Sequence, residues 1–371
     1  MQFGLSSEQT LLKDSIDTFL REQAPLPRVR RFADSDEGRA AELQQGLTDL
    51  GVTGLLVPER FGGVGLKPLD ACLAAESMGY HVAPVAFGAN AAMVPAALLA
   101  AGSAAQQAEW LPRIAAGRAI VGAALSEHTG ARATGSATLG TAGEAAAVHC
   151  RGGRLSGRAL FVIDFEADAY LVADQGGGLH LVAADTPGLT RQRLATVDRT
   201  RPIGELRFDA VHADPLPGAS PAVLRQVLAI GRAVLAADTL GAAQAMLDQA
   251  VAYAGQRQQF GRVIGSFQAV KHLCAEMAAA LEPTRAFVWY AGHALGEGAA
   301  DADLACCQLK AHLGEVGRAV AKSATEVHGG MGFTDLLGLH YWFKRIGLNR
   351  QLLGTPERLR LEAARLQGLA A

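Results

Sequence analysis

The sequence predicts an α+β protein with three parts: a helical N-terminal domain, a middle domain that is an antiparallel β-barrel or sandwich, and a C-terminal four-helix bundle. Three observations predict this order. Apolar residues recur at helical spacing up to about residue 118, short β-prone runs follow up to about residue 217, and long alanine- and leucine-rich stretches fill the remainder. We therefore expect domains at residues 1–118, 119–217 and 218–371.

Helical spacing and stop signals mark the N-terminal elements. Ser6 or Ser7 can cap a first helix, in which apolar residues recur through Leu20. A second helix ends before Gly51, and a glycine-rich loop, FGGVGLKP, follows it. Including that second helix, we expect helical segments at 43–50, 69–78, 89–101 and 103–116.

The middle segment contains five β-prone runs: AIVGAAL, ALFVIDF, AYLVA, LHLVAA and GELRFDAV. No helical stretch between them could carry a parallel crossover, so we expect antiparallel strands. Beyond them, helices are expected at about 220–254, 264–296, 301–328 and 337–368, the last interrupted near Gly354-Thr355-Pro356. Four long helices in series are typical of a bundle.

Composition excludes several classes of function. The 371 residues are half apolar and carry a formal net charge of −2, without a lysine- or arginine-rich block that would indicate nucleic acid or an anionic membrane as partner. No run of about 20 apolar residues predicts a membrane span, and the N-terminal stretch lacks the apolar core of a secretory signal, so we expect a cytoplasmic protein. The five cysteines form no CxxC pair and the ten histidines no HExxH motif, so no metal site is expected.

Three glycine-containing segments could bring the backbone close to a ligand. FGGVG at 61–65 is best interpreted as a plain turn, whereas HGGMGF at 328–333 lies between two helices and leaves the main chain open to a phosphate. The third segment, RQQFGRVIGSFQAVKH, offers the Arg257 guanidinium, the Phe260 ring and the Gln268 amide. An ordinary helix-turn-helix with solvated charges explains the same residues.

These segments resemble the motifs of acyl-CoA dehydrogenases. YAGQRQQFGRVIGSFQAVKH is similar to the family's YxxxRxQFGxxIxxFQxxxH, and EVHGGMGFT is similar to QxxGGxGF. ALSEHTG at 124–130 resembles a diverged LTEPxAGSD segment, and VPERFGGVG resembles the PExxGGxG loop. The resemblance covers essentially the whole chain. It implies FAD as cofactor, an acyl-CoA substrate, an electron-transfer flavoprotein as electron acceptor, and a tetramer built from dimers.

The resemblance also implies that each FAD is shared between two subunits. Arg257, Phe260 and Gln268 match residues that grip the pyrophosphate and adenine side of a neighbouring subunit's FAD. The remaining matches are Glu326 and Gly330 at the adenosine half, Thr355 and Glu357 after the last motif, and Leu125, Ser126, Phe161 and Ile163 beside the isoalloxazine ring. Glu326 stands where the family usually has glutamine, which adds a carboxylate that is unfavourable near a diphosphate unless it binds ribose hydroxyls.

The implied reaction is α,β-dehydrogenation, in which a carboxylate removes the α proton of the thioester. Counting along the motifs places the usual base at Leu353 and the alternative base at Gly231, and neither residue can accept a proton. Arg232 matches a family arginine, although a salt bridge within the bundle explains it equally well. Asp238, seven residues after Gly231, is the next acid along that helix. If isolated among apolar residues, it would have a raised pKa and could act as the base; pairing with an arginine is the alternative.

Several functions are compatible with this pattern. The chain resembles one subunit of a heteromeric enzyme of the kind that acts on steroid side chains or other bulky acyl groups, where one subunit lacks a working base. A self-sufficient homo-oligomeric dehydrogenase of fatty acid or steroid side-chain degradation would instead use Asp238. A non-catalytic FAD-binding partner subunit and a related flavin oxidase are further alternatives.

Overall fold

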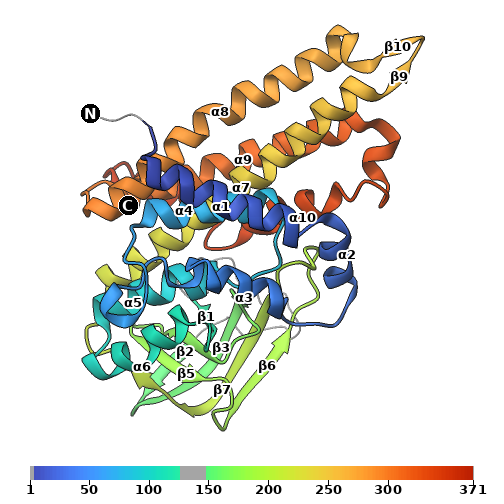
Figure 1. Ribbon diagram of the computed structural model, residues 1–371. Coiled ribbons are helices and arrows are strands. Elements are labelled where there is room, and N and C mark those ends of the chain that lie inside the picture. Colours follow the sequence, from blue (N-terminus) through green and yellow to red (C-terminus); the bar gives the residue numbers. More distant parts are fainter. Residues whose placement is uncertain (1–3, 126–147, 371) are drawn as a thin grey trace.

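Figure 1 shows a computed structural model of the chain, which describes residues 4–125 and 148–370. Helices form one half of the molecule and a β domain forms the other half. The predicted order of helices, strands and helices is confirmed. No helix in these two ranges has the length and apolar character needed to cross a bilayer.

The N-terminal helices follow the predicted positions closely. Ser6 caps the first of them through a reciprocal capping box, because the Gln9 amide donates to Ser6 Oγ at 3.2 Å and the Ser6 amide donates to Gln9 Oε1 at 3.1 Å. The sequence prediction missed α2, whose proline lies in the first turn, where it is tolerated. The elements are α1 (Ser7–Gln23), α2 (Leu26–Asp34), α3 (Ala41–Asp49), η1 (Val52–Gly54), η2 (Glu59–Phe61), α4 (Pro68–Tyr80), the π-helix η3 (Gly88–Met93), α5 (Val94–Ala101) and α6 (Ala104–Ala115).

The β domain is a sandwich of two four-stranded sheets with the orders β1-β4-β5-β8 and β2-β3-β7-β6. Side chains from both sheets share one apolar cluster. Neither sheet closes on itself among the described strands, so the barrel alternative is wrong. The strands are β1 (Val121–Ala124), β2 (Val148–Arg151), β3 (Arg154–Val162), β4 (Ala169–Ala173), β5 (Leu179–Ala183), β6 (Leu189–Arg193), β7 (Gly204–His212) and β8 (Asp214–Pro215).

One strand pair contradicts the purely antiparallel prediction, because β1 pairs with β4 in parallel. The crossover that a parallel pair requires is normally a helix. Here the chain between β1 and β4 passes through β2 and β3 of the other sheet, and this excursion serves as the crossover. The prediction assumed that a parallel pair needs a helix as its crossover, and it therefore missed the pairing of β1 with β4.

The C-terminal helices are α7 (Pro221–Gln256), α8 (Gln268–Glu297), α9 (Ala302–His328), α10 (His340–Gln351) and α11 (Pro356–Leu366). The predicted interruption near Gly354 is the break between α10 and α11, where Gly354 has a φ of +111°. A two-stranded ribbon, β9 (Gln258–Gln259) and β10 (Arg262–Val263), and the short helix η5 (Ile264–Ser266) join α7 to α8. The GGMGF motif forms the 3-10 helix η6 (Gly329–Phe333) after α9.

The helices before and after the β domain share one core, although more than 100 residues separate them in the sequence. Helix α4 crosses α7 at close range through two glycines. A Cβ on Gly79 would overlap the Asp238 carbonyl, and a Cβ on Gly241 would overlap the Glu76 carbonyl. The limits of the predicted domains at 118 and 217 therefore stay a prediction, since the apolar core runs through both helical segments.

We expect Gly241→Ala to destabilise the protein by about 1–3 kcal/mol, because the added methyl must push the α4 backbone away from α7. Gly347→Ala is the matched control: Gly347 lies inside α10, and a Cβ there meets nothing within 4 Å. Removing a flexible glycine from an open helical position should raise stability by about 0.5–1 kcal/mol. Melting temperatures measured by circular dichroism should shift in opposite directions, and equal shifts would contradict the close crossing.

Candidate functional site

The residues expected beside the flavin ring come from the ends of two β strands. Leu125 follows β1, and Ile163 follows β3 and forms an isolated bridge with Ala123. Leu125 and Ile163 are each 3% exposed and belong to the same apolar cluster, whereas Phe161 is 37% exposed. Phe161 has a φ of +54° at a register shift between β3 and β7, and such irregularities re-aim side chains. Ser126 lies outside the described residues.

The two positions at which the resemblance places the catalytic base meet in space. A Cβ on Gly231 would lie 2.6 Å from Leu353 Cδ1 and 2.7 Å from Met93 Sδ. Leu353 is 6% exposed and belongs to the same apolar cluster as Leu125 and Ile163. Two separate counts along the sequence therefore lead to one place in the fold. The side chains that occupy it are apolar.

The backbone at Leu353 is strained and held by a buried arginine. Leu353 has a φ of +56°, which costs energy for any residue other than glycine and is often found at functional sites. Arg232 Nε donates to the Leu353 carbonyl at 3.1 Å, while both terminal nitrogens bind Glu362 at 2.8 Å. The structure thus contains the salt bridge considered as the alternative for Arg232, and the same guanidinium also binds the Leu353 carbonyl.

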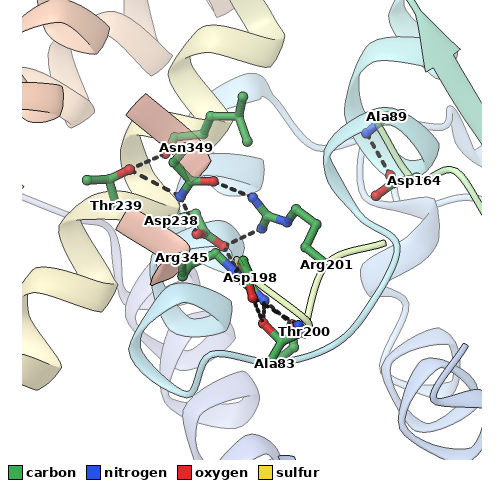
Figure 2. Close-up of polar contacts among 11 residues, drawn as sticks. Ala83, Ala89, Asp164, Asp198, Thr200, Arg201, Asp238, Thr239, Arg345 and Asn349 are labelled. Atoms are coloured by element: carbon green, nitrogen blue, oxygen red, sulfur yellow. Dashed lines mark hydrogen bonds and ion pairs between the residues drawn. The ribbon is translucent and has the colours of Figure 1, made fainter. Parts of the chain in front are cut away.

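Asp238 is not isolated, contrary to the expectation for a catalytic base. Figure 2 shows it inside a network of arginine and asparagine side chains. Its Oδ2 accepts hydrogen bonds from Arg201 at 2.8 Å and from Arg345 at 3.3 Å, and its Oδ1 accepts one from Asn349 at 2.6 Å. The alternative considered from the sequence, pairing with an arginine, is what the structure contains.

The environment of Asp238 stabilises its ionised form. Burial alone would raise the pKa of Asp238, but the charges of Arg201 and Arg345 and the Asn349 hydrogen bond outweigh burial and leave the pKa below its ordinary value. The expected raised pKa is wrong. A carboxylate with a low pKa and with both oxygens hydrogen-bonded is a weak proton acceptor. This geometry favours a structural role for Asp238.

Arg345 extends the same network to three parts of the chain. It lies on α10, is 0% exposed, and donates to Asp198 at 2.7 Å and to Thr200 at 2.6 Å in the loop before β7. It also donates to the Ala83 carbonyl, just after α4, at 3.3 Å. The buried Arg345 and the partly buried Arg201 balance the charges of the two buried aspartates, Asp198 and Asp238. The network fixes α10, and hence the Leu353 turn, against the β domain.

Met93 completes the apolar wall, and no sequence motif indicated it. It ends the π-helix η3, whose first amides are capped by Asp164: the Ala89 amide donates to Asp164 Oδ2 at 2.8 Å (Figure 2), and the Asn90 amide donates to the same oxygen at 3.0 Å. π-Helical turns are rare and often lie at functional sites. The spacing of Arg345 and Asn349, four residues apart, could have indicated a shared polar face on α10.

The second group of expected FAD contacts lies around the β9–β10 ribbon. Figure 1 shows this ribbon at the projecting end of α7 and α8, away from the β domain. Arg257 and Gln268 are exposed, and Phe260 is 92% exposed with a φ of +51°. Among the described residues, Phe260 forms one ring pair. Its ring packs edge-on against Phe267, at 6.1 Å between ring centroids. Contacts within this chain do not explain such an exposed aromatic side chain.

The expected contacts Glu326 and Gly330 belong to the same end of the bundle. The Tyr253 and His328 rings stack at 4.7 Å between centroids and join the end of α7 to the end of α9. Glu326 is exposed and forms a 3.7 Å ion pair with Lys322, and a Cβ on Gly330 would meet nothing within 4 Å. Nothing in the described chain requires a glycine at 330, so the space beside it is open to a ligand.

Thr355 and Glu357 lie instead beside the Leu353 turn. The Thr355 hydroxyl caps α11 by accepting from the Arg358 amide at 3.4 Å. Glu357 accepts a hydrogen bond from Arg350 at 2.9 Å. These contacts order the first turn of α11.

The two groups cannot hold one FAD within a single chain. Gly231 and Arg257 are separated by most of α7, about 39 Å at a rise of 1.5 Å per residue. That distance exceeds the length of an extended dinucleotide. The residues present fit FAD only if the ribbon of one chain reaches the β domain of another, with a guanidinium for the pyrophosphate and an aromatic face for a stacked ring.

Comparisons with known proteins agree with the motifs. The protein-family model described as acyl-CoA dehydrogenase, N-terminal domain, matches residues 6–118. The family model described as acyl-CoA dehydrogenase, C-terminal domain, matches residues 221–367. The chain is 30% identical to acyl-CoA dehydrogenase IpdE2 of Mycolicibacterium smegmatis, over 97% of this chain and 99% of that protein.

Solved structures are similar over the same extent. The structure titled Tcur3481-Tcur3483 steroid ACAD G363A variant matches with a TM-score of 0.85 and 30% identity, covering 97% of this chain and 98% of that one. The ChsE4-ChsE5 complex from Mycobacterium tuberculosis matches with a TM-score of 0.88 over 100% of both chains. Its sequence is 24% identical, so this second similarity concerns the fold alone.

Proposed function

This chain belongs to the acyl-CoA dehydrogenase family, and from that premise we propose that it is the base-free subunit of a heteromeric, FAD-dependent acyl-CoA dehydrogenase. The observation that carries the proposal is the contact between Leu353 and Gly231, the two places where a base is expected. Neither has a proton acceptor, and the nearby acid Asp238 is neutralised by two arginines. A chain built in this way needs a companion that supplies the carboxylate.

The proposed division of labour follows from the chemistry of the thioester. FAD, when bound, supplies the acceptor for the hydride that leaves the β-carbon. The α proton is weakly acidic, so its removal needs a positioned carboxylate and hydrogen bonds to the thioester oxygen. In this chain Leu353 and Met93 can pack against an acyl group and exclude water, but they cannot take a proton. Arg232 keeps the backbone of this wall in place.

The ribbon is the contribution that this chain makes to its companion. Arg257, Phe260 and Gln268 are exposed at the end of α7 and α8, where they can reach a flavin held by the neighbouring β domain. We therefore propose that they grip the pyrophosphate and adenine side of the companion's FAD. The companion's own base then acts beside that flavin.

We propose a bulky, steroid-type acyl-CoA as the substrate. The supporting observation is the 30% identity over nearly the whole chain to a protein whose structure is titled a steroid ACAD. An electron-transfer flavoprotein is the oxidant that the family resemblance implies, and we propose one of that class as the partner that reoxidises the enzyme.

The test is anaerobic reduction of bound FAD, followed by its visible absorption. The chain purified with its native companion should bleach on addition of a steroid-type acyl-CoA, whereas the chain alone should stay yellow. Bleaching by the chain alone that is lost in Asp238→Asn would support a self-sufficient enzyme instead. Flavin that stays oxidised with the companion present and a full panel of acyl-CoAs would indicate a non-catalytic subunit. Hydrogen peroxide formation in air at the turnover rate would indicate an oxidase.

A further inference from the structure

Three side chains with different donor atoms meet at one end of the β sandwich. Cys150 lies on β2, Asp174 directly follows β4, and His180 lies on β5. One donor atom from each residue lies within 4.8 Å of those from the other two. His180 Nε2 and Asp174 Oδ2 are 2.8 Å apart, and their side chains are 6% and 12% exposed. The flavin and acyl-CoA residues considered above do not include any of the three.

This donor set has the chemistry of a site for a divalent transition metal. A thiolate, a neutral imidazole and a carboxylate are the ligands that zinc sites combine, usually in tetrahedral geometry. The thiolate and the carboxylate carry two negative charges, so a divalent cation makes the site neutral. Neutrality matters here because an unbalanced charge in this partly buried position is costly.

We propose that Cys150, Asp174 and His180 bind one zinc-class divalent ion, with a water molecule as the fourth ligand. The ion replaces the proton between His180 and Asp174, and Cys150 loses its thiol proton on binding. Binding therefore releases these protons to solvent. The site is separate from the proposed dehydrogenase function and does not depend on it.

The carboxylate is already oriented for this role. Asp174 Oδ1 accepts hydrogen bonds from the Gly176 amide at 2.7 Å and from the Gly178 amide at 3.0 Å, which turns Oδ2 toward His180. Outer contacts of this kind fix ligand orientation in metal sites. Asp174 Oδ2 is thus already aimed at the position beside His180.

The glycine run between Asp174 and His180 keeps the space around the donors open. A Cβ on Gly178 would lie 2.5 Å from Asp174 Oδ2 and 3.1 Å from His180 Nε2. Any larger residue there would fill the position between the two donors. Gly177 has a φ of +85°, so the turn that places His180 opposite Asp174 also favours glycine.

A metal ion at this position would link the two sheets. β2 belongs to one sheet, while β4 and β5 belong to the other. The ion would therefore clamp an end of the sandwich through coordination bonds, in addition to the apolar core between the sheets. We expect its effect to be on the stability of the β domain rather than on turnover.

The experiment uses the tag-free, FAD-bound full chain after treatment with a chelator. Zn²⁺ titrated into it should bind at one ion per chain by elemental analysis and raise the melting temperature. Co²⁺ should give the visible bands of tetrahedral thiolate coordination at wavelengths longer than the flavin absorption. Cys150→Ser should weaken binding about 100-fold or more, since even outer contacts are worth 10–100-fold in metal sites.

The matched control is Cys274→Ser, which removes a partly buried cysteine of α8 that lies outside the cluster. It should bind Zn²⁺ and Co²⁺ like the unmodified chain. His180→Gln gives a second loss of ligand, and its flavin content reports whether it folds. The proposal would be overturned by absence of stoichiometric Zn²⁺ binding, by a six-coordinate Co²⁺ spectrum, or by unchanged affinity in Cys150→Ser. In each case the hydrogen bond between His180 and Asp174 would serve only to stabilise the β4–β5 turn.

Discussion

Leu353→Glu is expected to make this chain reduce its own FAD when a steroid-type acyl-CoA is added without oxygen. Leu353 stands where the resemblance places the usual base, and its side chain packs directly against Gly231, the alternative base position. A glutamate among apolar neighbours has a raised pKa, which suits a base that works near neutral pH. Positioned general bases contribute about 10²–10⁴-fold to a rate, so we expect a gain of that order in the single-turnover rate of flavin reduction.

Leu353→Gln is the control for this gain. Glutamine has nearly the same shape as glutamate and fills the same space, but it cannot accept a proton. Flavin content and substrate binding should match in the two variants, while bleaching should occur only with glutamate. Equal rates in the two variants, or an inert glutamate variant that holds both FAD and acyl-CoA, would show that this position is not where the proton is removed.

The second large effect is expected on stability, from Arg345→Met. Arg345 is completely buried and carries the ion pair to Asp198, while it shares Asp238 with Arg201. Among the described residues, its loss leaves Asp198 without a cationic partner, and breaking a buried pair in this way costs about 3–5 kcal/mol. We expect a large fall in melting temperature, together with loosening of the α10–α11 turn and weaker retention of FAD.

Arg199→Met tests whether the effect comes from burial rather than from charge alone. Arg199 lies beside Asp198 in the chain, but its 3.2 Å ion pair with Asp34 is exposed, with side chains 54% and 62% accessible. Exposed pairs contribute at most about 1 kcal/mol. Comparable losses in the two variants would mean that the buried network does not hold the three parts of the chain together.

Sequence patterns predicted the helices well because each helix carries its own signals. The Ser6 cap, the stop at Gly51 and the break at Gly354 are local features, and the structure places them as expected. The parallel pairing of β1 and β4 depends instead on where the chain goes between them. That information is absent from any short window of sequence.

The candidate site likewise contains residues that local motifs indicate and contacts that only the fold creates. Leu353 and Gly231 were found by counting within motifs, but only the fold brings them into contact. The environment of Asp238 could not be predicted, because its partners Arg201 and Arg345 lie 37 and 107 residues away in the chain. The cluster of Cys150, Asp174 and His180 has no sequence motif for the same reason, since its residues lie on β2, just after β4 and on β5, in two different sheets.

The close crossing of α4 and α7 also has a consequence for folding during synthesis on the ribosome. The buried residues of α4 include Ala71, Cys72, Ala74, Ala75 and Met78, and α4 packs against α7 and α8, which are synthesised only after the β domain. Part of the apolar surface of the N-terminal helices therefore stays exposed to solvent while the β domain is synthesised. Contacts between such distant segments close slowly, and uncovered apolar faces invite aggregation. During translation this chain should be a client of chaperones that shield its N-terminal third.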